Sequence, residues 1–398
     1  MSPPCAETTR PYNKLMDHLL AVVEGAGPVS TTRRNDDGWT HEPLAARGFW
    51  PTWHPSGDRL ALSTVRQEPD GPRIAIEIFR PGLPASVMAH SPPPGAAAVI
   101  APRIPHYVYW SPAGDTLSFV APSDDGLALF LSDADGAFTS DRIAGGAPLF
   151  SCWRADGRRL AIHAGADLSV LDLNTRRTTT VAENAVGFRS PSYVGETLVY
   201  AVGEPPGVAL MALDPASDGP RLLRRFAGGV ALLERPGTNE LAVCVTPEPN
   251  TGLFYDLWRT DVREPDAARR IARGPFIAAT WSPTGEHIAL VVPTQIGDGK
   301  YAIHVRDANG AFVAATEGFL PSQDFRIYLG FFDQYAKSHH IWSPAGDALV
   351  FTGRLGNDGT AWSFSDKMND YVFLWPVERG APLEVVCEGD LAFFAHRR

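Results

Sequence analysis

Polar side chains of the types used in acid–base catalysis gather near residue 335 of this 398-residue chain. An imidazole exchanges protons near neutral pH, and a neighbouring carboxylate can orient the ring and favour its protonated form. A short segment combines a carboxylate, an amide, a phenol and two imidazoles, namely Asp333, Gln334, Tyr335, His339 and His340. We therefore expect acid–base chemistry here, with Asp333 orienting one of the two histidines.

This segment stands just before a unit that recurs along the chain. The stretch "IWSPAGDALVF" from Ile341 resembles "TWHPSGDRLAL" from Thr52, "YWSPAGDTLSF" from Tyr109, "CWRADGRRLAI" from Cys152 and "TWSPTGEHIAL" from Thr280. Two weaker copies begin at Ser190 and Leu232. The turn glycines of the seven copies lie 38 to 61 residues apart and are Gly57, Gly114, Gly157, Gly195, Gly237, Gly285 and Gly346. Repetition at about this period is typical of propeller blades.

Each copy contains the elements of one blade. An apolar run ends at tryptophan, a glycine turn follows, and an alternating strand comes next, with a third and a weaker fourth strand behind it. The 72 glycines and prolines suit so many turns. We expect an all-β fold, a seven-bladed β-propeller of four-stranded antiparallel blades over residues 47–398. Apolar residues at helical spacing also predict a short helix near residues 12–24, within an N-terminal extension over residues 1–46.

The Trp-Ser-Pro-x-Gly pattern and the alternating strand after it resemble the repeat of TolB-like β-propellers, which is WD-repeat-like. The propeller domains of prolyl oligopeptidases are similar. The resemblance covers roughly residues 47–390 and implies a fold that hosts many activities. The hydrolase domain of the peptidases is not implied, because the chain has no G-x-S-x-G nucleophile elbow.

In a propeller, the residues leading into each innermost strand converge at one end of the central channel. Most are apolar or small here, but a few repeats supply polar or aromatic groups. We expect His339, His340, Asp333 and His106 to be catalytic, and His339 rather than His340 to face the channel. We expect the substrate to contact Arg189, Tyr335, Gln334, Trp50, Tyr107 and Phe188. The long connection over residues 318–338 is expected to cover the channel mouth.

Two functions remain open. The first is a cofactor-independent lyase, hydrolase or cyclase that acts on a small molecule, whose anionic group Arg189 would bind. The second is a non-catalytic scaffold that binds a peptide or protein partner, as the TolB resemblance suggests. No organic cofactor is expected. A divalent metal could be bound across the channel by His106, His339 and Asp333, but the spacing of these residues does not require one.

Composition narrows the class of protein. A net charge of −10 argues against nucleic acid or an anionic membrane as the main partner. No stretch reaches 18 apolar residues, so no membrane span is expected. Four widely separated cysteines favour free thiols over a disulfide or zinc framework. The N-terminal residues do not resemble a secretory signal, and we expect a cytoplasmic protein.

Overall fold

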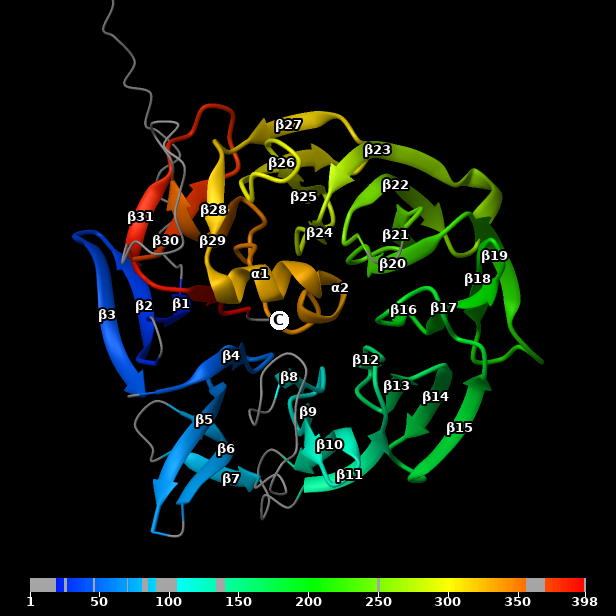
Figure 1. The fold of residues 1–398 in the computed structure, drawn as a ribbon, viewed down its shortest axis with the longest axis horizontal. Helices are drawn as coiled ribbons and strands as arrows, with labels where there is room; N and C mark the ends of the chain where they lie inside the picture. Colours follow the sequence, from blue (N-terminus) through cyan, green and yellow to red (C-terminus); the bar gives the residue numbers. More distant parts are fainter. Residues whose placement is uncertain are drawn as a thin grey trace, which may run out of the picture.

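Antiparallel sheets are arranged in a ring around a central channel, as the computed structural model shows (Figure 1). The structure describes residues 19–24, 27–45, 47–69, 71–80, 85–90, 106–133, 140–248, 251–355 and 369–396. Each sheet is ordered from the channel outwards, and neighbouring strands are antiparallel throughout. The all-β class and the four-stranded units are thus confirmed.

The first five repeats form separate four-stranded sheets. Their strands are β4 (Phe49–Trp53), β5 (Leu60–Glu68), β6 (Gly71–Phe79) and β7 (Ser86–His90); β8 (His106–Trp110), β9 (Thr116–Ser123), β10 (Gly126–Asp133) and β11 (Ser140–Gly145); β12 (Leu149–Trp153), β13 (Arg159–Ala164), β14 (Asp167–Asp172) and β15 (Arg177–Ala182); β16 (Ser192–Val194), β17 (Thr197–Glu204), β18 (Gly207–Leu213) and β19 (Arg221–Phe226); β20 (Gly229–Glu234), β21 (Glu240–Thr246), β22 (Phe254–Asp261) and β23 (Arg269–Phe276). A 3₁₀ turn, η2 (Pro265–Ala267), lies between the last two.

The last two repeats share one eight-stranded sheet. It contains β24 (Ala278–Trp281), β25 (His287–Pro293), β26 (Tyr301–Asp307) and β27 (Phe312–Ala315), then β28 (Phe319–Pro321), β29 (Ala348–Leu355), β30 (Tyr371–Pro376) and β31 (Glu384–Glu388). The short strand β28 joins the two units because it pairs with both β26 and β29. The innermost segment of the last repeat is reduced to a single bridge between Trp342 and Leu349.

An eighth four-strand unit closes the ring, so the predicted number of seven blades is not confirmed. It combines β1 (Leu19–Val23), β2 (Val29–Asn35) and β3 (Gly38–Ala45) with the C-terminal strand β32 (Leu391–Phe394), in the order β3-β2-β1-β32. Strands from both ends of the chain therefore build one blade (Figure 1). Residues 29–45 of the predicted extension lie within this sheet.

The predicted helix near residues 12–24 is wrong over Leu19–Val23, which form β1; residues 12–18 lie outside the described part. Leu20 to Val23 are fully buried, with β2 on one side and β32 on the other. A strand buried on both faces is apolar at every position, so its composition also satisfies a helical pattern.

Tryptophan side chains link successive blades, as expected for wedges between them. Four of the repeat tryptophans donate their indole N–H to a residue of the preceding unit. The bonds run from Trp53 to Phe393 O (3.2 Å), from Trp110 to Thr52 O (3.1 Å), from Trp153 to Ser118 Oγ (3.2 Å) and from Trp342 to Thr280 O (3.3 Å). In the bond from Trp53, β32 takes the place of the innermost strand of the preceding unit. This bond therefore links the first repeat to the C-terminal strand and helps to close the ring.

The glycine turns allow this close packing. Gly114 has a φ of +76°, and a Cβ atom there would meet His54 Nε2 of the preceding blade at 1.9 Å. Only glycine avoids both the strain and the clash. We call the side of the ring that carries these turns the turn face, and the opposite side, where the innermost strands begin, the leading face. Neither helix in the described part of the chain is long and apolar enough to cross a membrane.

Replacing Trp342 with alanine should lower the free energy of unfolding by about 3 to 5 kcal/mol, because a large aromatic side chain would leave a cavity between blades. Its side chain is 2% exposed. Phe312→Ala is the matched control, since Phe312 lies on an outer strand and is 52% exposed. Chemical denaturation measures both. Equal stability of the two variants would contradict the wedge role.

Candidate functional site

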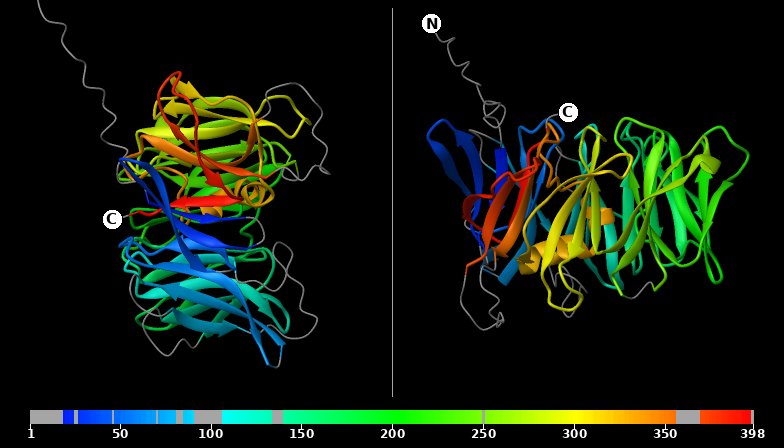
Figure 2. Two further views of the ribbon diagram at one scale, coloured as in Figure 1. Left: turned by 90° about the vertical axis from the view of Figure 1, so that its left-hand side faces the viewer. Right: turned by 90° about the horizontal axis from the view of Figure 1, so that it is seen from above.

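The connection between β28 and β29 is a plug inside the ring. It contains α1 (Gln323–Gly330), whose first turn is capped by Ser322 Oγ accepting from Phe325 N at 3.1 Å, and α2 (Phe332–Tyr335). Both helices lie at the centre of the ring and close to one of its faces (Figures 1 and 2). Phe325, Tyr328 and Phe332 are each 1% exposed. The segment predicted to cover the channel mouth therefore closes the channel near one face of the ring (Figure 2).

An ion pair anchors the plug to the ring. Arg189 Nη2 lies 2.9 Å from Asp333 Oδ1, and Arg189 Nε donates to Oδ2 at 3.3 Å. The backbone N–H of Ser190 donates to the same Oδ2 at 3.3 Å, and Arg189 also donates to Gly330 O. Asp333 is completely buried. The carboxylate thus pairs with Arg189, and its predicted role in orienting a catalytic histidine stays a prediction.

Gln334 and Tyr335 face the ring from the other side of α2. Ser151 N donates to Gln334 Oε1 at 3.0 Å. The Tyr335 ring stacks on Trp50, with centroids 4.5 Å apart and planes 9° apart, and meets Tyr107 edge-on at 5.0 Å. Trp50 and Tyr107 both have positive φ angles, 53° and 51°, which directs the two rings onto the plug at a cost in backbone strain.

Two polar atoms of the plug are buried without a described hydrogen-bond partner, Tyr335 Oη and Gln334 Nε2. Burial raises the pKa of Tyr335 well above its ordinary value. A phenol held so firmly in its neutral form donates or accepts a hydrogen bond but does not act as a base. These residues therefore hold the plug, and the four cavities described below are lined by other side chains.

His339 is buried, the reverse of the predicted orientation. Its Nε2 lies 3.0 Å from Thr52 Oγ1, and its Nδ1 lies 2.7 Å from Ser338 Oγ. The ring also packs edge-on against Trp50 and Phe393. Burial lowers the pKa of His339 to about 3, so the ring is neutral at physiological pH. A neutral, enclosed imidazole with both nitrogens engaged is a packing residue that joins the plug to β4 and β32.

His340 lies on the other side of the plug, where it faces open space. Its ring packs against His396, with centroids 3.9 Å apart and planes 35° apart. His396 follows β32 and its Nε2 lies 3.1 Å from Trp342 O, while Phe394 N donates to His340 O at 2.8 Å. The end of the chain thereby brings a second imidazole beside the predicted one.

Phe188, another predicted residue, does not join this group. Phe188 is 7% exposed and stacks on His163 with centroids 4.4 Å apart. His163 lies within hydrogen-bond distance of Arg189 O and Ala185 O. His106 begins β8, but its side chain lies outside the described part. Among the described residues, no group of three or more His, Cys, Asp or Glu side chains is placed to hold a metal ion.

A funnel opens on the turn face, beyond the plug. Its main cavity has a volume of about 430 Å³. Smaller cavities of about 310 Å³ and 40 Å³ share lining residues with it, including Tyr109. The main cavity is lined by two tryptophans, two histidines and one charged side chain of each sign. These residues are Trp281, Trp342, His340, His396, Glu234 and Lys337. Of these, sequence analysis singled out only His340 as a site residue.

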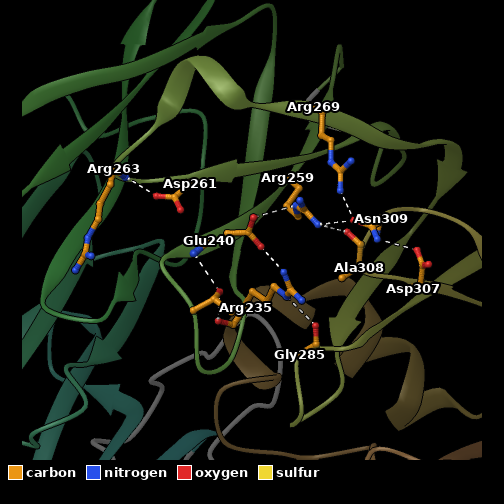
Figure 3. Close-up of polar contacts among 11 residues, drawn as sticks. Arg235, Glu240, Arg259, Asp261, Arg263, Arg269, Gly285, Asp307, Ala308 and Asn309 are labelled. Atoms are coloured by element: carbon orange, nitrogen blue, oxygen red, sulfur yellow. Dashed lines mark hydrogen bonds and ion pairs between the residues drawn. The ribbon is translucent and has the colours of Figure 1, made fainter.

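An ionic network holds one wall of the funnel in place (Figure 3). Glu240 pairs with Arg235 and, at 3.1 Å, with Arg259. Arg235 Nε donates to Gly285 O of the next glycine turn at 2.7 Å, and Arg259 Nη1 donates to Ala308 O at 2.6 Å. The network fixes the turn after β20 against the next repeat, so the wall that carries Glu234 is rigid.

Comparison with known proteins supports the fold. No model of a known protein family and no curated protein matches the sequence. The chain is similar to a solved structure of a eukaryotic initiation factor, with 12% identity, a TM-score of 0.56, and coverage of 96% of this chain and 98% of that one. Apo AztD from Citrobacter koseri has 10% identity and a TM-score of 0.53, over 95% and 99%.

Prolyl endopeptidase is similar in one part only. It has 13% identity and a TM-score of 0.57 over 87% of this chain, which spans 50% of the length of that chain. The predicted likeness to the propeller domains of prolyl oligopeptidases is thus confirmed for the fold. At such identities the comparisons establish the β-propeller fold and leave the function to be argued from the site.

Replacing Arg189 with alanine should lower the free energy of unfolding by about 2 to 4 kcal/mol, because the buried Asp333 carboxylate loses its charge partner. Arg189 is 29% exposed, which keeps the loss below that of a fully enclosed pair. Arg142→Ala is the control, since its pair with Asp125 is exposed and worth at most about 1 kcal/mol. A double variant with Asp333→Asn should recover part of the loss. Equal losses in Arg189→Ala and Arg142→Ala would show that the pair is not an anchor.

Acidification should destabilise the wild type more than His339→Gln. The unfolded chain binds a proton at His339 near pH 6.5, but the folded chain does so only near pH 3, so stability falls as pH falls between these values. From pH 6.5 to 4.5 the difference amounts to about 2 to 3 kcal/mol. Urea denaturation at both pH values, with both proteins, gives the comparison. Parallel pH profiles would place His339 in contact with solvent.

Proposed function

We propose that this propeller binds a small molecule in the funnel on its turn face. The main support is the contrast between the two ends of the channel. The plug fills the leading end, whereas the other end keeps a cavity of about 430 Å³. Ligand sites are concave, mostly of about 300 to 1,000 Å³, and combine apolar walls with a few polar groups. The tryptophans, imidazoles and charged groups of the funnel match this description.

The side chains in the funnel favour a ligand with an anionic group. Lys337, His340 and His396 all line the main cavity and the 40 Å³ cavity beside it. An ammonium group with adjacent imidazoles binds a carboxylate through charge-assisted hydrogen bonds. From the sequence, Arg189 was expected to bind the anionic group of the ligand. We assign this role to Lys337 instead, because Arg189 is paired with Asp333.

Acid–base catalysis on the bound ligand is the second candidate. The observation that favours it is the pair of imidazole rings at the cavity wall, His340 and His396, 3.9 Å apart. One ring can exchange a proton with the ligand while the other orients it. A lyase, hydrolase or cyclase that needs no organic cofactor would use this arrangement. A scaffold for a peptide or protein partner would need neither the imidazole pair nor an enclosed cavity.

A metabolite screen by thermal shift tests the proposal. Compounds that bind the folded state raise its melting temperature by mass action. Hits should stabilise the wild type and lose their effect in a Lys337→Ala, His340→Ala double variant. Arg177→Ala is the control, because Arg177 lines a separate cavity of about 340 Å³ between two outer blade edges. If no compound shifts the wild type, or if all hits persist in the double variant, the funnel is not the site.

Turnover of a hit separates enzyme from binding protein. Mass spectrometry of the hit after incubation with wild type should show a product if the second candidate is correct. His340→Ala should then slow its formation by about 10²- to 10⁴-fold. Binding without any product would leave the protein as a binder.

A further inference from the structure

Charges of opposite sign stand at different depths of the funnel. Lys337 follows α2 closely and is half-buried, on the plug side of the cavity. Its Nζ donates to Ser192 Oγ of β16 at 3.3 Å, so the ammonium group reaches across from the plug to the ring. Glu234 ends β20 and is exposed beside the glycine turn, at the mouth of the funnel. A cation thus lies at the base and an anion at the rim.

Both charges act on the same interior region. Burial raises the pKa of the Cys152 thiol on β12, Lys337 opposes that rise, and Glu234 adds to it. The two side chains also line the same main cavity. A ligand in this cavity therefore experiences both charges at once, and a purely anionic ligand is repelled by Glu234 as well as attracted by Lys337.

The wall between the charges is aromatic and rigid. Trp281 and Trp342 contribute to it and are 7% and 2% exposed. Pro236, Pro283 and Pro344 of three successive turns lie beside them. The Arg235 guanidinium lies over the Trp281 ring, 5.5 Å from its centroid, on the ionic network that fixes the wall. Such a surface binds an apolar body through packing.

We infer that the ligand is a small zwitterion, with a carboxylate and an amine on one compact apolar body, of the size of an amino acid or a dipeptide. Lys337, flanked by His340 and His396, binds the carboxylate at the base. Glu234 binds the ammonium group at the rim, and the tryptophan wall packs on the apolar part. This inference rests on the proposed function, because it names the class of ligand for the same funnel.

The structure also predicts that ligands carrying only one of the two charges bind more weakly in the funnel. Removing the amine from the ligand leaves Glu234 facing a molecule that carries only a carboxylate. Removing the carboxylate takes away the anionic acceptor that Lys337 would bind and brings an amine near it. Each loss should weaken binding by about tenfold or more, because it removes one charge-assisted hydrogen bond.

Calorimetric titration with matched probes tests the inference. The probes are L-leucine, L-phenylalanine, L-tryptophan and L-prolyl-L-phenylalanine, and for the best binder its deaminated and decarboxylated analogues. We expect the zwitterion to bind at least tenfold more tightly than either analogue. Glu234→Gln should abolish the preference over the deaminated analogue, and Lys337→Gln the preference over the decarboxylated one. Thermal unfolding of each variant confirms that it is folded, and Arg177→Ala should keep the wild-type preferences.

Each result decides one question. If an analogue with one charge binds as tightly as its zwitterion, or if the Gln variants keep the wild-type preferences, the ligand class is wrong. If none of the probes binds but the metabolite screen yields a funnel ligand, the zwitterion inference fails and the proposed function stands. If neither the probes nor the screen gives a funnel ligand, both fail.

Discussion

The fold depends on closure of the ring by its own two ends. β32 is the innermost strand of a blade whose other strands, β1 to β3, come from the opposite end of the chain. The Trp53 indole bonds to Phe393 O, and Ser322 and Thr352 donate to Asp390 O just before β32. A blade that shares its strands between the termini makes closure of the ring depend on this long-range pairing. Bringing the two ends of the chain together lowers the conformational entropy of the chain. The contacts buried in this blade must offset that cost.

Closure also decides where chemistry can take place. The plug enters the ring between the last two repeats and bonds to several blades, through Arg189, Ser151 and Thr52. Because the plug occupies the leading end, Arg189 and Ser151 there bind plug residues. His339 is buried against Thr52 and Phe393, while its neighbour His340 emerges on the turn face beside His396. One end of the channel is thus sealed, and the same segment supplies Lys337 and His340 to the other end.

Local sequence patterns were sufficient to predict the repeats. Each Trp-x-x-x-Gly turn marks one four-strand unit, and the tryptophans link blades as expected. The eighth unit was missed because its identity depends on pairing Leu20 with Phe394, a contact that no local pattern encodes. The apolar run at Leu19–Val23 fits helix and strand alike, and only its buried neighbours on both sides decide between them.

The candidate site was predicted in part, for a physical reason. Asp333, Arg189, Tyr335 and His339 do gather around the plug, but sequence cannot distinguish an ion pair that binds a substrate from one that anchors a helix. The orientation of His339 and His340 was reversed, because the segment before Trp342 is not a regular strand and alternation does not apply to it. Glu234 ends β20 and His396 follows β32, so neither lies at the start of an innermost strand, where the polar groups were expected to converge.

His339 and His340 are adjacent in the chain but differ in their exposure to solvent. One is sealed behind the plug and the other lines the funnel. Covalent modification with diethyl pyrocarbonate, followed over time by peptide mass spectrometry on the folded protein, measures both in one experiment. We predict that His340 is modified rapidly and that His339 is protected until the protein unfolds. Modification of His339 at a rate equal to or greater than that of His340 would contradict the sealed plug, and with it the assignment of the ligand site to the turn face.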